Sequence, residues 1–234
     1  MKKLADFTYL ILLCLSFSAY SVGLRLEPTR LILNSDHPST TFTVINGDSI
    51  PYFIQATVTE QIEGTKSPYF LVTPYLFRLE ANNQSSARVL LKNNSELPAD
   101  RESLFFLNTR AIPAEKHLRE RANKTKPTFV TNIIIKVFYR PSHLSAPNSH
   151  IFQRVTLHQQ QKMWKFNNPT PYYLTVVNIK YNQKNYNKSL ILAPFSDTEI
   201  PNIQGNIFQA QWQMINDFGG LSDEFTYLPA IVTE

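Results

Sequence analysis

The sequence Phe-Val-Thr-Asn-Ile-Ile-Ile-Lys-Val-Phe-Tyr-Arg-Pro, residues 129–141, decides how the rest of the chain is interpreted. β-Branched and aromatic residues fill it, glycine is absent, and its proline stands at the end, where a missing N–H interrupts no ladder. We therefore expect one long β-strand. Lys136 is the single charge within the apolar run, and an ammonium buried there without an anion would be costly. The segment predicts either a solvent-facing lysine or an acidic group that meets it.

Short runs of alternating apolar and polar residues continue on both sides of this strand, and no segment shows the 3.6-residue period of a helix. In the first half, strands are expected over residues 31–34, 40–45, 52–60, 69–72, 75–79, 86–92, 103–111 and 129–139. In the second half, they are expected over residues 151–157, 163–166, 172–181, 189–192, 209–216, 225–228 and 231–232. The pattern predicts an all-β protein, and the strand density of the first half is typical of an immunoglobulin-like β-sandwich.

The length of 234 residues is comfortable for two such domains. Residues 1–21 have a short basic start, an apolar run and small residues near the end, which predicts a cleaved secretory signal peptide. The two domains are then expected over residues 22–141 and 142–234, because proline, serine and asparagine cluster directly after Pro141. No later stretch approaches the ~20 apolar residues of a membrane span, so the mature chain is not expected to be membrane-inserted.

Charge and motif content disfavour several classes of function. The net charge is only +5, and the densest basic stretch, residues 116–126, mixes both signs and lacks aromatics. This predicts a solvated loop and no nucleic-acid binding. The single cysteine, Cys14, lies in the predicted signal peptide, so the mature chain is expected to have no disulfide. Because histidine pairs, a nucleophile elbow and a phosphate-binding loop are also missing, we expect no enzyme, no metal site and no cofactor.

Residues 97–113, Leu-Pro-Ala-Asp-Arg-Glu-Ser-Leu-Phe-Phe-Leu-Asn-Thr-Arg-Ala-Ile-Pro, match the signature of the PapD-like periplasmic pilus chaperones of chaperone/usher systems. Thr109 departs from it, since the family usually carries an aliphatic residue there. Further agreement lies in residues 27–32, 136–141, 168–173 and 216–220. The chain thus resembles this family over its whole mature length.

The resemblance implies two immunoglobulin-like domains in an L or boomerang arrangement. It implies a periplasmic chaperone that binds, folds and caps pilus subunits by donor-strand complementation and delivers them to the outer-membrane usher. The sandwich fold of PapD and the pairing of a chaperone strand with a pilin are both known for the family. For this chain they are therefore implications of the resemblance.

In the family, two basic residues in the cleft between the domains anchor the C-terminal carboxylate of the subunit. By position in the matched segments, the resemblance assigns this role to Arg30 and Lys136. A carboxylate between an arginine and a lysine forms charge-assisted contacts, so the lysine in the apolar strand would gain its partner. Anchoring there would also set the register of the added strand.

The strand that leads to Lys136 is the implied donor strand. Side chains of one parity point away from the lysine's side, and most of them are large and apolar. These residues are Phe129, Thr131, Ile133 and Ile135. Exposed on an edge strand, such a row would be an aggregation hazard, but here it is expected to fill the groove of an incomplete subunit. Thr131 is polar where the family usually has an aliphatic residue, which indicates a shifted register or a different subunit preference.

Three more charges, Glu102, Arg140 and Asp217, fall on positions that the family uses to lock the two domains together. The alternative for each is an ordinary surface charge, and an exposed triad would add little net stability. At the level of the whole protein, the alternative function is a secreted two-domain immunoglobulin-like adhesion or binding module. The sequence leaves open which subunits and usher are served, the loop subclass, and whether the free chaperone caps itself as a dimer.

Overall fold

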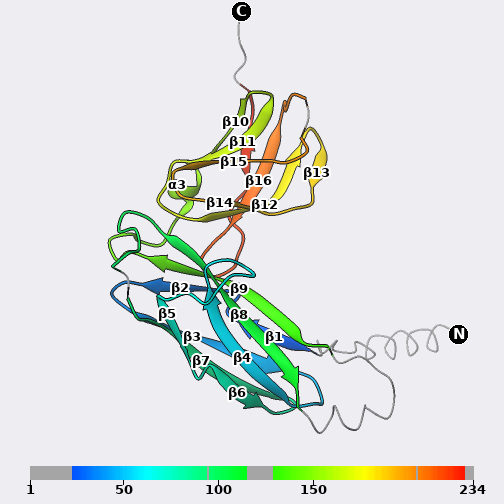
Figure 1. Cartoon of the computed structure of the whole chain (residues 1–234). Helices are drawn as coiled ribbons and strands as arrows, with labels where there is room; N and C mark the ends of the chain where they lie inside the picture. Colours follow the sequence, from blue (N-terminus) through cyan, green and yellow to red (C-terminus); the bar gives the residue numbers. More distant parts are fainter. Residues whose placement is uncertain (1–22, 94, 115–128, 204, 230–234) are drawn as a thin grey trace, which may run out of the picture.

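The computed structural model describes residues 23–93, 95–114, 129–203 and 205–229, and it consists of two β-sandwiches that meet at an angle (Figure 1). The protein is all-β with two immunoglobulin-like domains, as predicted. Three expectations lie outside the described residues: the signal peptide, the polar loop at 116–126 and the strand at 231–232. The domain boundary after Pro141 stays a prediction.

The N-terminal sandwich has two sheets. The first has the order β1-β3-β7-β5, with β1 at Leu24–Glu27, β3 at Ser39–Asn46, β7 at Asn83–Leu91 and β5 at Phe70–Thr73. The second has the order β2-β9-β8-β4-β6, with β2 at Arg30–Asn34, β9 at Thr131–Arg140, β8 at Ser103–Pro113, β4 at Tyr52–Thr59 and β6 at Leu76–Leu79. Alternation along the strands places Phe42, Ile54 and Leu107 between the sheets, fully buried.

The C-terminal sandwich is smaller. One sheet has the order β10-β11-β15, with β10 at Thr156–Gln160, β11 at Met163–Asn168 and β15 at Ser196–Glu199. The other sheet has the order β13-β12-β16-β17, and β14 also pairs with β12. The strands of this sheet are β12 at Leu174–Tyr181, β13 at Lys184–Tyr186, β14 at Leu190–Leu192, β16 at Ala210–Ile215 and β17 at Phe225–Tyr227. Its core contains an edge-to-face pair of Phe166 and Trp212 with ring centroids 5.1 Å apart.

The strand predicted over residues 151–157 is wrong over residues 151–155, since β10 begins only at Thr156. Residues Ser149–Phe152 form a short helix, α3, which the Asn148 side chain caps by accepting a hydrogen bond from the N–H of Ile151. Phe152 and Val155 both face the core. Apolar residues three apart suit a helical turn as well as an irregular strand, so periodicity over so few residues misled the prediction. Three short strands, β1, β13 and β15, were not anticipated.

Strand β9 has different neighbours along its length. On one side it pairs with β8 from Thr131 to Tyr139. On the other side it pairs with β2, in parallel, but only from Lys136 onward. Within the described ranges, residues 131–135 therefore have a strand partner on one side only. This half of β9 is a sheet edge with backbone groups available to another strand.

Candidate functional site at the domain junction

Two cations lie side by side where β2 begins to pair with β9. Arg30 is the first residue of β2, and its register partner in the parallel ladder is Lys136. Both side chains are partly buried. The ammonium of Lys136 reaches the C-terminal sandwich, where Nζ donates to Oγ1 of Thr175 on β12 at 3.4 Å. The pair therefore lies between the two domains, at the end of the open edge of β9.

Neither cation is neutralised within the described part of the chain. Burial lowers the pKa of Lys136, and the positive charge of Arg30 lowers it further. Burial also lowers the pKa of Arg30, which the nearby charge of Asp217 partly opposes. The Nε atom of Arg30 is buried and has no hydrogen-bond partner in the described part of the chain. Since unpaired buried donors and charges are costly, the site favours an added anion.

Arg140, at the end of β9, has the opposite environment. Its Nε donates to Oε1 of Glu102 at 2.7 Å. Its Nη1 and Nη2 donate to the two carboxylate oxygens of Asp217 at 2.7 and 3.0 Å. Arg140 and Glu102 are buried and Asp217 is partly buried. Because Asp217 follows β16 in the C-terminal sandwich, this bidentate pair links the two domains.

Further contacts surround this triad. The second oxygen of Glu102 accepts a hydrogen bond from the N–H of Tyr173 at 2.8 Å, and the Arg140 guanidinium lies 5.6 Å from the ring centroid of Tyr172. Burial raises the pKa of Glu102, and Arg140 opposes this rise. Burial alone would lower the pKa of Arg140, but the two carboxylates outweigh it and raise that pKa. Each charge in the triad therefore depends on its partners.

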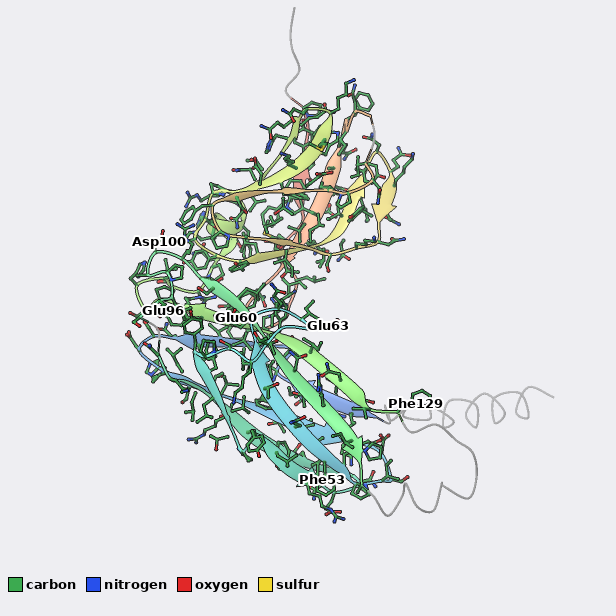
Figure 2. All side chains as sticks on the ribbon, in the orientation of Figure 1. Phe53, Glu60, Glu63, Glu96, Asp100 and Phe129 are labelled. Atoms are coloured by element: carbon green, nitrogen blue, oxygen red, sulfur yellow. The ribbon has the colours of Figure 1, made fainter. Side chains whose placement is uncertain are left out.

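The four predicted donor-strand residues do not share one environment. Phe129 is 75% exposed and lies at the far end of the N-terminal sandwich, just before β9 (Figure 2). Thr131 is also exposed, but Ile133 packs partly against the core and Ile135 is only 9% exposed. The expectation of a fully exposed row is wrong for Ile135, because this parity of β9 faces the opposite sheet. Only the side chains at the beginning of the strand are not covered by the opposite sheet.

Sequence reasoning missed several features of the junction. It did not single out Thr175 or Tyr173, whose contacts with Lys136 and Glu102 depend on how the domains meet. It identified Thr109 as unusual, and the hydroxyl of Thr109 is buried without a hydrogen-bond partner among the residues that the structure describes. No cluster of three or more potential metal ligands occurs among the described residues. No helix in those ranges has the length and apolar character to cross a membrane.

Known families match both domains. The family model "Pili and flagellar-assembly chaperone, PapD N-terminal domain" matches residues 23–145. The model "Pili assembly chaperone PapD, C-terminal domain" matches residues 150–226. Together they cover nearly all of the part that the structure describes.

Individual relatives agree with the two family models. Chaperone protein FimC of Escherichia coli O6:H1 is 32% identical over 209 residues, which cover 87% of this chain and 83% of FimC. The structure of the E. coli chaperone DraB is similar, with a TM-score of 0.76, 30% identity, and coverage of 88% of this chain and 98% of DraB. A structure of the Salmonella enterica SafA pilin in complex with the SafB chaperone is also similar. The match has a TM-score of 0.76 and 27% identity, and it covers 90% of this chain and 98% of the matching chain. The chain therefore belongs to the PapD family of pilus-assembly chaperones.

Proposed function

We propose that this chaperone works in the periplasm, where it binds the last β-strand of a pilus subunit along the open edge of β9 and delivers the subunit to the outer-membrane usher. Arg30 and Lys136 hold the C-terminal carboxylate of that subunit. One observation carries the proposal: among the residues that the structure describes, two partly buried cations without an ion-pair partner lie at the end of a strand edge that has no neighbouring strand. The function requires binding only, and no catalytic residue or cofactor has a part in it.

The geometry gives the direction of the bound strand. A client strand on the open edge takes up the same side of β9 that β2 occupies from Lys136 onward. If its carboxylate lies at Arg30 and Lys136, its chain runs in the same direction as β9, and it is therefore parallel, as β2 is. Main-chain hydrogen bonds supply affinity, and the fixed carboxylate prevents a one-residue slip that would turn every side chain to the other face.

Three side chains of β9 and its approach are available to the client. Phe129 and Thr131 are exposed, and Ile133 is partly exposed, so these enter the groove of the incomplete subunit. Ile135 stays in the chaperone's own core. The donor row of this chaperone is therefore Phe129, Thr131 and Ile133, one side chain shorter than the four-residue row expected from the sequence.

The triad of Glu102, Arg140 and Asp217 has the role of holding the two domains at a fixed angle. Its support is the set of contacts between the domains, which includes the bidentate pair. A fixed angle keeps Thr175 next to Lys136, so the anion site keeps its shape before a client arrives. Preorganisation of this kind lowers the cost of binding.

Relatives support a pilus-subunit client, since the related SafB chaperone was solved in complex with the SafA pilin. The secreted adhesion module, which the sequence alone left open, does not account for two matched chaperone domains. The strand edge and cation pair are the parts of a chaperone that such a client would use.

Co-expression tests this function. The protein is produced in the periplasm together with a pilus subunit from the same organism, and we expect a one-to-one complex to co-purify. Arg30→Met and Lys136→Met each remove a charge while keeping an unbranched apolar stem, and we expect both to weaken the complex by at least about tenfold, so that little of it co-purifies. Arg88→Met, which removes an exposed cation on β7, is the matched control and should leave the complex intact. Complex retained by both site variants would refute the anchoring role.

A further inference from the structure

The turn after β16 presents an unusually exposed aromatic side chain. Among the residues that the structure describes, Phe218 is the most exposed large apolar side chain, at 93%, followed by Phe129 at 75%. A single exposed apolar residue needs no functional explanation. The rigidity and the position of Phe218 are what distinguish it.

Hydrogen bonds fix the turn that carries Phe218. The side-chain oxygen of Asn216 accepts from the N–H groups of Phe218 and Gly220 at 3.0 and 2.9 Å. The backbone of Asn216 also bonds to Gly219 and Gly220, at 3.0 and 2.9 Å. An aromatic ring on such a turn has only two side-chain torsions left to order when a partner binds.

The same turn packs closely on the N-terminal sandwich. Gly219 has a φ of +85°, and a Cβ atom there would lie 2.7 Å from Oγ1 of Thr29. Only glycine permits this approach. On the other side of Phe218, Asp217 forms the bidentate pair with Arg140. The turn is thus held against both β9 and the residue before Arg30.

These contacts place Phe218 beside the proposed carboxylate site. Thr29 directly precedes Arg30 in the chain, and Asp217 lies close enough to Arg30 to influence its pKa. The loop after β16 reaches the N-terminal sandwich in Figure 1. At the other end of the open edge, Phe129 precedes Lys136 by a span of about 23 Å for an extended chain. The turn that carries Phe218 therefore lies near one end of the open edge of β9, and Phe129 lies at the other end.

We propose that Phe218 is a client-binding residue that packs against an apolar or aromatic side chain among the last residues of the pilus subunit. This proposal rests on the proposed function. A client strand that ends at Arg30 and Lys136 cannot continue along β9, because β2 occupies that edge from there on. Its last side chains therefore lie next to Thr29 and the turn with Phe218. The carboxylate fixes register, and Phe218 selects clients by the size and apolarity of their C-terminal residues.

The first test compares client affinities of matched variants. Phe218→Ser is compared with Phe208→Ser, which changes another exposed phenylalanine of the same domain, 67% exposed. Affinity is measured by competition with wild-type chaperone for the co-purified subunit. We expect Phe218→Ser to bind about tenfold more weakly, the scale of one interface hot spot. Phe208→Ser should bind as wild type, and Phe218→Tyr should recover most of the affinity that Phe218→Ser loses, with thermal midpoints unchanged in all three variants.

The second test reports contact directly. The Phe218→Trp variant places an indole in the turn, and its fluorescence is compared with that of wild type, whose Trp164 and Trp212 are buried in the core. We expect the additional emission to shift to shorter wavelength when the subunit binds, because the ring leaves water. Emission that does not shift would overturn the proposal.

The outcomes separate this proposal from the one it depends on. If Arg30→Met and Lys136→Met both retain the subunit, the anchoring role on which this proposal rests fails. If Lys136→Met loses the subunit while Phe218→Ser binds it as tightly as wild type, only the role of Phe218 fails. Normal subunit binding by Phe218→Ser with defective delivery to the usher would also overturn it, since the ring would then serve a different partner.

Discussion

Lys136 and Arg140 lie on the same face of β9, four residues apart, and both are at least partly buried, yet their surroundings differ. Arg140 is met by two carboxylates, at 2.7 Å each. Lys136 has a neighbouring cation and a threonine hydroxyl. In our proposal, the cation that is paired within the chain, Arg140, holds the domains together through Asp217. A buried cation that has no anion nearby, such as Lys136 within the described ranges, lowers the stability of the free protein and favours the binding of an anionic partner.

The largest expected effect is on the satisfied cation. Arg140→Ala leaves Glu102 buried without its counter-ion, so we expect the free energy of unfolding to fall by about 3–5 kcal/mol. Urea denaturation followed by circular dichroism measures this loss. The control is Arg78→Ala, which breaks an exposed ion pair with Glu80 and should cost at most about 1 kcal/mol. Equal losses in the two variants would show that the triad does not stabilise the junction.

Removal of the unsatisfied cation, Lys136, should raise the free energy of unfolding, whereas removal of Arg140 lowers it. Lys136→Met removes a partly buried charge, so we expect the free chaperone to become more stable by about 1–2 kcal/mol while it loses its client. The same denaturation assay and the co-purification assay measure the two effects. A Lys136→Met protein less stable than wild type would mean that Lys136 already has a stabilising partner.

The pH dependence gives a second view of Lys136. Its pKa is lowered in the folded chain, so between that value and the ordinary value of about 10.4 the unfolded chain binds more protons. The free energy of unfolding should therefore gain a contribution that increases with pH in this window, by at most about 1.4 kcal/mol per pH unit for one proton.

Comparison of the free energy of unfolding of wild type with that of Lys136→Met across this pH window isolates the contribution of Lys136.

The affinity for the client should depend on pH with the opposite sign. A bound carboxylate raises the pKa of Lys136, so affinity should fall as pH rises through the pKa of the free chaperone. Affinity that is constant over this range would contradict a charged lysine at the binding site.

The smallest expected effect concerns an uncharged group in a similar situation. The hydroxyl of Thr109 is buried without a hydrogen-bond partner, as is Nε of Arg30. Thr109→Val keeps the shape and removes the hydroxyl, so we expect a gain of about 1 kcal/mol in the free energy of unfolding and no change in client binding. Loss of stability in thermal or urea unfolding would show that the hydroxyl has a partner, such as a bound water.

Much of the fold follows from local sequence pattern. The β-branched and aromatic pattern of residues 129–141 correctly predicted a long strand, and the anomaly of Lys136 was visible from the sequence alone. That pattern gives two faces but does not say how far along the strand each face is covered. For this reason the burial of Ile135 was not anticipated. The polar and very short strands β13 and β15 carry too few residues for an alternation to be recognised.

The site was less accessible to sequence reasoning. The grouping of Arg30 with Lys136, and of Glu102 with Arg140 and Asp217, came from a family resemblance, because these residues are far apart in the chain. Thr175, Tyr173 and the position of Phe218 depend on how two domains meet, which no local pattern encodes. The segment 216–220 was noted for its match, yet the exposure of its aromatic residue required the structure.

The most direct test of the central claim measures whether the client's terminal carboxylate interacts with Lys136. The affinity of the subunit, with either a free carboxylate or a C-terminal carboxamide, is measured for wild type and for Lys136→Met. We predict that the carboxamide binds wild type at least about tenfold more weakly, the scale of a charge-assisted contact of about 1.4 kcal/mol or more, and that it causes little further loss in Lys136→Met. Equal binding of carboxylate and carboxamide to the wild-type chaperone would contradict the account.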